Sequence, residues 1–191
     1  MGEIMDKRII RTKNNISFAL LKLIEKKSAN KITVSELAKE ANIERKTFYL
    51  HYSCIEDVYQ ELGKTIANDI ECEADKIIAS KDNMITNIFS HINYVINKNI
   101  YFFRAISKND SYSFLLHSFE NTLSKCMKRI VKEIYHISSP NIELYTDFYS
   151  AGIIKLYQSW LKGDTSLTQE EITRVISKAC FISIDDLANR R

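Results

Sequence analysis

The sequence predicts an all-α protein of about nine helices, with an N-terminal helix-turn-helix domain and a larger C-terminal helical bundle. Only four Gly and one Pro occur in 191 residues, whereas folds built from strands and turns need more of both. Apolar residues recur at three- and four-residue spacing along the chain, as in amphipathic helices. Two helix starts carry the capping-box pattern S/T-x-x-E, at Thr33–Glu36 and at Thr168–Glu171. We expect a domain boundary between residues 53 and 54, giving domains 1–53 and 54–191.

The N-terminal domain reads as three helices, of which the second and third are short. After a first amphipathic helix, the Thr33 capping box starts a helix that ends near Ala41. Asn42 follows, and asparagine tolerates the left-handed conformation that a tight turn requires. A second short helix is predicted over residues 45–51, with Phe48 and Tyr52 on its inward side. Two short helices joined by a tight turn form a helix-turn-helix, in which the second helix enters the DNA major groove.

The C-terminal domain reads as a long helix from about residue 55 and five further helices. The same periodicity and breaker signals place these five helices over residues 84–98, 100–106, 111–136, 140–161 and 168–187.

Positive charge is concentrated at the N-terminus. Residues 1–53 contain 11 Lys or Arg against 6 Asp or Glu, whereas residues 61–191 contain 16 of each. A basic end on an otherwise neutral chain indicates a polyanionic partner at that end. On the predicted recognition helix, the residues left to point outward are hydrogen-bond donors or cations, suited to phosphates and base edges: Arg45, Lys46, Thr47, Tyr49 and His51.

These residues carry a resemblance to a known family. The capped stretch 33–41, the turn Asn42-Ile43 and the stretch Lys46-Thr47-Phe48-Tyr49-Leu50-His51-Tyr52 resemble the TetR/AcrR family of bacterial transcriptional regulators. The resemblance implies three DNA-binding helices and a helical domain that dimerises and binds an effector. It also implies contacts with double-stranded DNA by Thr33 at a phosphate, by His51 at the backbone, and in the groove by Arg45, Lys46, Thr47 and Tyr49. Arg11 is expected to follow the DNA backbone.

Three positions depart from the family pattern. Asn42 stands where the family often has Gly, and Glu44 stands where it often has Ser or Thr. Ile55 stands where a Lys usually contacts phosphate at the start of the fourth helix. Glu44 is therefore expected to cap the recognition helix poorly. At Ile55 we expect one fewer backbone contact, or a contact placed elsewhere.

The C-terminal helices predict a homodimer. The helix over residues 140–161 is apolar on two sides, so two sides must be covered. Together with the last helix it would form a four-helix interface with a second copy, as the family does. The residues expected there are Ile142, Tyr145, Tyr149, Gly152, Leu156, Trp160, Ile172, Val175, Ile176 and Ala179.

An aromatic-rich middle segment predicts a pocket for a small apolar or aromatic effector. The residues expected to line it are Tyr94, Phe102, Phe103, His117, Tyr145 and Tyr149. For each of them, a role in the hydrophobic core is the competing interpretation.

The chain lacks the patterns of other classes of protein. It contains no P-loop, G-x-S-x-G, H-E-x-x-H or G-x-G-x-x-G pattern, which argues against an enzyme and against a cofactor. The four cysteines and four histidines are scattered without ligand spacing, which argues against a metal site and a disulfide scaffold. Neither a signal peptide nor a membrane span is expected, so the predicted location is the cytoplasm.

The sequence favours a ligand-responsive repressor that acts as a homodimer on a near-palindromic operator, and leaves two alternatives open. The segment 152–172 also resembles, faintly, a TetR subgroup that includes regulators of dihydroxyacetone-kinase operons, some of which work with a protein coactivator. An activator that needs a protein coactivator is therefore one alternative. The other is a helical protein-interaction module that does not bind DNA.

Overall fold

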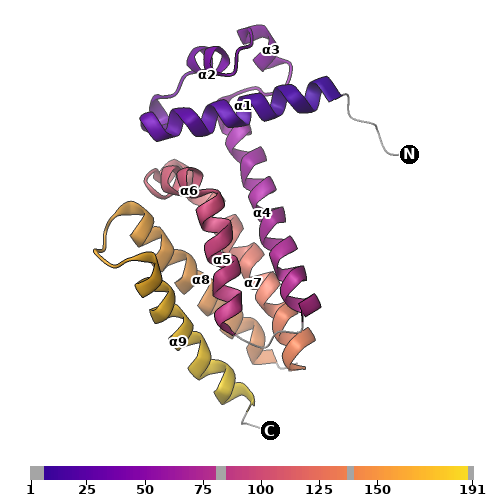
Figure 1. The fold of residues 1–191 in the computed structure, drawn as a ribbon, viewed down its shortest axis with the longest axis vertical. Helices are drawn as coiled ribbons and strands as arrows, with labels where there is room; N and C mark the ends of the chain where they lie inside the picture. Colours follow the sequence, from indigo (N-terminus) through magenta and orange to yellow (C-terminus); the bar gives the residue numbers. More distant parts are fainter. Residues whose placement is uncertain (1–6, 81–84, 137–139, 189–191) are drawn as a thin grey trace. The chain divides into compact units, whose positions relative to one another are not determined.

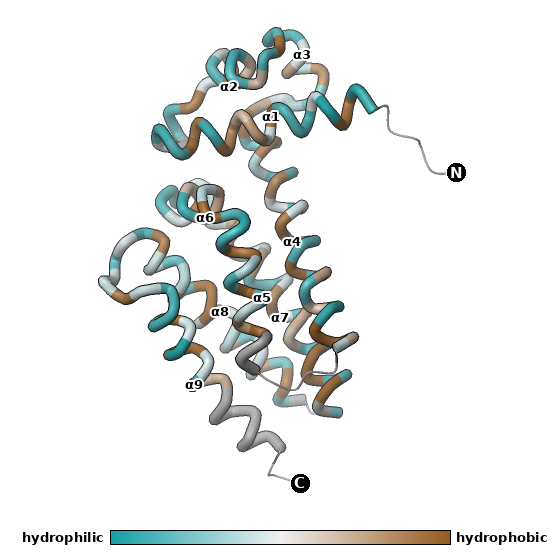
Figure 2. Tube along the Cα trace, viewed as in Figure 1, coloured by the Kyte–Doolittle hydropathy of each residue, from teal (hydrophilic) through white to brown (hydrophobic). Residues whose placement is uncertain are grey.

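The computed structural model describes residues 7–80, 85–136 and 140–188, and every regular element within these ranges is helical, as predicted (Figure 1). The elements are α1 (Lys7–Lys26), η1 (Ala29–Lys31), α2 (Val34–Glu40), α3 (Arg45–Tyr49), α4 (Ile55–Ser80), α5 (Ile85–Lys98), α6 (Ile100–Ser107), η2 (Asp110–Tyr112), α7 (Ser113–Tyr135), α8 (Pro140–Lys162) and α9 (Gln169–Ala188). Hydrophobic and hydrophilic residues alternate along the helices, as expected for amphipathic helices that each bury one side (Figure 2).

The chain divides into two compact units, Met1–Thr65 and Ile66–Arg191. The division falls within α4 and not before it, where the sequence placed the domain boundary. The reason lies in the first turns of α4, because Ile55, Val58 and Tyr59 are buried. Lys13 of α1 also forms an ion pair with Glu61 of α4, with 2.6 Å between Nζ and Oε2.

Unit 1 is organised around α1, with α2 and α3 on one side of it (Figure 1). The buried face of α1 consists of Ile16, Ala19 and Leu20. Leu37 of α2 and Phe48 of α3 are fully buried as well. At the start of α4, the carboxylate of Asp57 accepts hydrogen bonds from the backbone amides of Ser53 and Cys54, which stabilises the helix terminus.

Unit 2 has α7 packed on α8 as its most extensive helix pair, with α6 packed on both. The axes of α5, α7, α8 and α9 are broadly aligned, with the chain reversing its direction between α8 and α9, whereas α6 is seen nearly end-on (Figure 1). An aromatic cluster anchors α6, because Phe103 lies 5.3 Å from Phe119 of α7 between ring centroids, and Phe102 also contacts Phe119. A second core cluster joins Ala74 and Ile77 of α4 to Cys126 and Ile130 of α7.

A polar node joins α5, α8 and α9. The Tyr157 hydroxyl donates to Asn93 Oδ1 at 2.7 Å and lies 3.0 Å from Thr173 Oγ1. Gln169 also donates to Asn93 Oδ1, at 3.1 Å. The predicted second capping box is present just before α9, where Thr168 and Glu171 exchange hydrogen bonds. Among the residues that the structure describes, no helix is both long and apolar enough to cross a membrane.

Candidate nucleic-acid interface

The turn between α2 and α3 has the conformation that the sequence predicts. Asn42 has φ = 55°, in the left-handed region. The amide of Ile43 donates to the carbonyl of Ala38 at 3.0 Å, and the amide of Asn42 donates to that of Lys39 at 3.1 Å, so the last turn of α2 is closed by backbone bonds. Two short helices joined by this turn form a helix-turn-helix.

The recognition helix α3 is shorter than predicted and ends at Tyr49, with Leu50 as its C-cap. Phe48 and Tyr52 are buried, as predicted, and their rings lie 5.7 Å apart. Arg45 and Lys46 are exposed, and 51 % of the Tyr49 surface is accessible. The structure thus brings these three side chains together on the outer side of one short helix, while Thr47 and His51 are half-buried at its edges.

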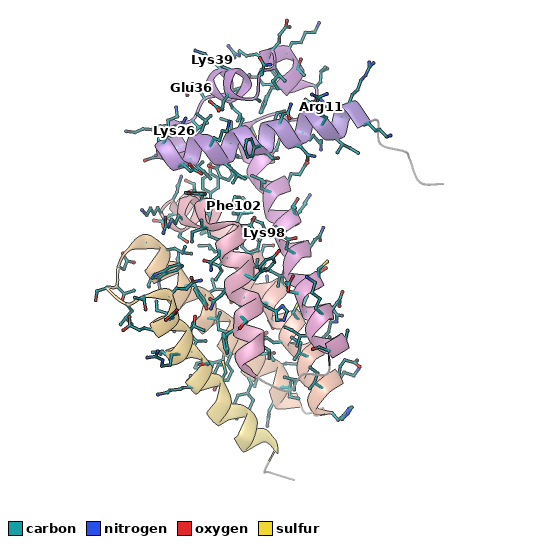
Figure 3. All side chains as sticks on the ribbon, viewed as in Figure 1. Arg11, Lys26, Glu36, Lys39, Lys98 and Phe102 are labelled. Carbon is teal, nitrogen blue, oxygen red and sulfur yellow. The ribbon has the colours of Figure 1, made fainter. Side chains whose placement is uncertain are left out.

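The cations of unit 1 differ in how they are paired. Lys13, Lys22 and Lys27 form ion pairs with Glu61, Glu40 and Glu36, respectively. Lys13 also lies over the Tyr52 ring, 5.2 Å from its centroid. Within the described part of the chain, by contrast, no carboxylate forms an ion pair with Arg11, Arg45 or Lys46. Figure 3 shows Arg11 on the N-terminal half of α1. These three cations therefore remain available to a polyanion.

Thr33 is the N-cap of α2 and is exposed, and its hydroxyl is already engaged. Its Oγ1 accepts from the Glu36 amide at 3.3 Å and donates to Glu36 Oε2 at 2.7 Å. Hydrogen bonds from Lys27 and from Thr33 lower the pKa of the Glu36 carboxyl to about 2, so this carboxylate is ionised at neutral pH. A phosphate contact from Thr33 therefore requires its hydroxyl proton to turn away from Glu36.

Two further residues at the recognition helix matter for its outer face. Glu44 is the N-cap of α3 and makes no side-chain capping bond, as its departure from the family pattern predicts. Leu50 has 73 % of its surface exposed, which is unusual for a leucine beside a polar face. An exposed aliphatic side chain at that place suits contact with a thymine methyl group.

The residues expected at a dimer interface divide into two groups. Ile142, Ile172 and Ile176 are buried inside unit 2, so they are core residues and are not accessible to a second copy. Tyr145, Gly152, Leu156, Val175 and Ala179 are exposed, and Tyr149 and Trp160 are half-buried. The most exposed apolar side chains on α8 in the described residues are Leu144 and Phe148, at 72 % and 71 %, and neither was expected at the interface from the sequence.

Most of the residues expected to line an effector pocket lie elsewhere. A cavity of about 80 Å³ is present within unit 2, lined by α4 to α8. Phe103 lines it, whereas Phe102 is buried in the core without lining it. Tyr94, His117 and Tyr145 are exposed, and Tyr149 is half-buried but does not line the cavity. The polar residues of the wall, Glu73, His91, Ser107, Tyr157 and Gln158, had no signal in the sequence that grouped them.

Comparisons with known proteins agree with this fold. A family model described as the C-terminal region of a transcriptional regulator, of the TetR class, matches residues 83–180, or 98 of the 191 residues. The chain gives no significant match to a curated protein sequence.

Solved structures resemble the chain along most of its length. The dihydroxyacetone kinase operon activator DhaS is 16 % identical, with a TM-score of 0.65, and the match covers 92 % of this chain and 96 % of DhaS. A protein from Syntrophomonas wolfei assigned to the TetR family is 15 % identical, with a TM-score of 0.71 and coverage of 87 % and 91 %. The TetR-family repressor AlkX from a Dietzia species is 17 % identical, with a TM-score of 0.54 and coverage of 91 % and 96 %. At these identities the neighbours establish the fold.

Proposed function

Because the chain belongs to the TetR family of transcriptional regulators, we propose that it represses transcription as a homodimer that places α3 of each copy in the DNA major groove. The observation that carries this proposal is the outer side of α3. Arg45, Lys46 and Tyr49 are exposed there, while Phe48 behind them is fully buried. The helix therefore presents donors and cations on a rigid support.

The contacts that we propose fall into two classes. Arg45, Lys46 and Tyr49, which are exposed, and Thr47 at the helix edge are proposed to contact base edges and groove walls. Arg11, Thr33 and His51 are proposed to contact the phosphate backbone, which positions the helix without reading sequence. Leu50 adds an apolar contact, which favours thymine at one position of the site.

The proposed dimer forms through the outer faces of α8 and α9. Leu144, Phe148, Gly152 and Leu156 follow one another at four-residue spacing on α8, which places them along one side of the helix. Within the described residues, a Cβ atom added at Gly152 would meet nothing within 4 Å apart from its chain neighbours and the backbone of its own helix, so a second helix can approach closely there. Val175 and Ala179 are likewise exposed and four residues apart on α9. Covering these apolar residues with a second copy removes them from water.

A homodimer carries two recognition helices related by a two-fold axis. Such a pair binds a near-palindromic operator whose half-sites are about one turn of DNA apart, or a multiple of it. A regulator of this kind works where bacterial DNA is, in the cytoplasm. In the proposed function an effector bound in unit 2 favours the dimer form whose recognition helices do not match the operator, which releases DNA.

Activation is the second candidate, because one structural neighbour is an operon activator by name and another is a repressor. The two are separated by a reporter assay in cells that express or lack the protein. A repressor lowers transcription from the bound promoter, whereas an activator raises it.

The central test is sequencing of genomic DNA captured by the purified protein, followed by titration of the captured site with salt. We expect a near-palindrome and an affinity that falls steeply as salt increases, because bound phosphates release counterions. The variant Arg45→Ala/Lys46→Ala/Tyr49→Ala should lose at least tenfold in affinity. Lys22→Ala/Lys26→Ala, which removes cations from the C-terminal part of α1, is the matched control. Unchanged affinity of the triple variant contradicts the proposed interface.

A further inference from the structure

The cavity of unit 2 has a wall that is mostly apolar. Eight isoleucines line it, contributed by α4, α5, α7 and α8. Such a wall excludes water and binds hydrocarbon. The cavity is therefore suited to a compound that is mostly apolar.

Its few polar groups decide which apolar compound fits. Ser107 is 1 % exposed, and its hydroxyl has no hydrogen-bond partner among the residues that the structure describes. A buried hydroxyl without a partner is rare in folded proteins, because leaving it unpaired costs free energy. Ser107 lines the cavity, so a ligand there can supply the missing partner.

The charged groups on the wall neutralise each other. Glu73 is buried, and its two carboxylate oxygens are taken by Lys76 Nζ at 2.6 Å and by His91 Nδ1. Burial alone would raise the pKa of Glu73, but the hydrogen bonds from Lys76 and His91 outweigh it and hold the pKa below its ordinary value. The carboxylate therefore stays ionised and already paired. The wall therefore offers neither an anionic nor a cationic ligand an unpaired group of opposite charge.

His91 leaves one ring nitrogen for a ligand. Its Nδ1 faces the Glu73 carboxylate, so the proton of that nitrogen points to Glu73. Among the described residues Nε2 forms no hydrogen bond, and it accepts a hydrogen bond when the ring is neutral and donates one when the ring is protonated. A hydroxyl group, which both donates and accepts, satisfies Nε2 and Ser107 alike. The Tyr157 hydroxyl is already bound to Asn93.

From this wall we infer that unit 2 binds a small, neutral, largely hydrocarbon compound with one hydroxyl group, and that Ser107 forms a hydrogen bond with that group. The cavity of about 80 Å³ is smaller than the roughly 150 Å³ cavities that hold benzene, so it fits about four to six non-hydrogen atoms. The ligand class follows from the cavity alone. Only the role of this compound as the effector that releases DNA rests on the proposed function.

Three probes of one shape test the charge selectivity: n-butanol, butyrate and n-butylamine, which are neutral, anionic and cationic at pH 7. Binding is followed on the full-length protein by NMR of ¹³C-labelled isoleucine methyl groups, without DNA. We expect n-butanol to shift methyl signals of the isoleucines on the wall and to leave Ile16 of unit 1 unchanged. Butyrate and butylamine should bind at least roughly tenfold more weakly, because burying an unpaired charge is costly. Equal binding of all three overturns the inference.

Two serine variants test the role of Ser107. Ser107→Ala should weaken n-butanol binding roughly fivefold. Ser150→Ala is the matched control, since Ser150 is equally buried, bonds to the Asp147 carbonyl and does not line the cavity. Unchanged n-butanol affinity in Ser107→Ala overturns the role of Ser107. Affinity that keeps rising through n-hexanol to n-octanol overturns the size limit.

A separate titration with operator DNA distinguishes this inference from the proposed function. Methyl shifts without DNA release leave the ligand class standing and contradict its role as effector. DNA binding without methyl shifts leaves the regulator standing and contradicts the ligand class.

Discussion

Thr33 and Glu36 close a reciprocal pair of hydrogen bonds at the start of α2. The backbone amide of Thr33 donates to Glu36 Oε2 at 3.0 Å, and the amide of Glu36 donates to Thr33 Oγ1 at 3.3 Å. Lys27 binds the other oxygen of the carboxylate at 2.5 Å. One side-chain pair therefore fixes both the start of α2 and its connection to the end of α1.

This pair predicts an acid-sensitive helix-turn-helix. The pKa of Glu36 is about 2 in the folded protein, below its ordinary value, so its contribution to stability is complete above about pH 5 and is lost as the pH falls towards 2. Glu36→Gln should flatten this part of the pH dependence, measured by urea unfolding between pH 5 and 2. Thr33→Ala should lower the free energy of unfolding at pH 7 by about 1 kcal/mol. An unfolding curve of Glu36→Gln that keeps the parent's acid dependence would show that other carboxylates cause it.

The left-handed backbone of Asn42 predicts unequal effects of two substitutions. Its φ of 55° is strained for a β-branched residue and free for glycine. Asn42→Val should therefore lower the free energy of unfolding by about 1–2 kcal/mol, while Asn42→Gly should change it by less than about 0.5 kcal/mol. Thermal unfolding monitored by circular dichroism measures both. Equal destabilisation by the two substitutions would mean that the asparagine side chain, and not the backbone conformation, holds the turn.

Arg11 and Lys13 are two residues apart on α1, but we expect their replacement by alanine to have different effects. Lys13 is paired with Glu61, whereas Arg11 is exposed and no carboxylate of the described residues forms an ion pair with it. Arg11→Ala should reduce the slope of log affinity against log salt by about one, as for the loss of a single phosphate contact. Lys13→Ala should leave that slope unchanged and lower the thermal midpoint instead. Fluorescence anisotropy of labelled operator at four salt concentrations measures the slopes, and a reduced slope in Lys13→Ala contradicts the assignment.

The helix-turn-helix of unit 1 could be predicted from the sequence because the patterns that specify it are local. A capping box, an asparagine in a tight turn and the pair Phe48 and Tyr52 each act within a few residues, and the structure has all three as predicted. The compact units divide within α4, after the buried Val58 and Tyr59, whereas the sequence predicts a boundary at the break before α4, because burial in a unit leaves no break in the chain.

The C-terminal sites were harder to predict because helix α8 is apolar on two sides. Periodicity shows that both sides must be covered, but it does not show which side faces the core. Ile142 therefore looked like an interface residue and is buried, whereas Leu144 and Phe148 are exposed. The residues that line the cavity were hard to predict for a similar reason, because they come from five helices that only the fold brings together. From the sequence alone, the exposed Tyr94 and His117 were as suitable for the wall as the residues that form it.

Three of the four thiols are expected to differ in reactivity. Burial raises the pKa of both Cys126 and Cys180 to about 11, so thiolate is scarce at pH 8, whereas Cys72 is exposed. Iodoacetamide should modify Cys72 first and leave Cys126 and Cys180 unmodified until the protein unfolds. Mass spectrometry of peptides after timed labelling measures the order, with urea-unfolded protein as the control. Early modification of Cys126 would contradict the packing of α7 against α4.

Phe148 offers the sharpest test of the dimer. Its side chain is 71 % exposed on the face of α8 that also carries Leu144, so a charge there costs the monomer little and opposes burial in an interface. Phe148→Asp should reduce the solution mass from twice 22.2 kDa to 22.2 kDa, measured by light scattering during size-exclusion chromatography. Operator affinity should then fall at least a hundredfold, because each copy holds only one half-site. Phe114→Asp is the matched control, since Phe114 is an exposed aromatic on α7 outside that face, and it should leave mass and affinity unchanged. A Phe148→Asp protein that stays dimeric requires the copies to associate through another surface.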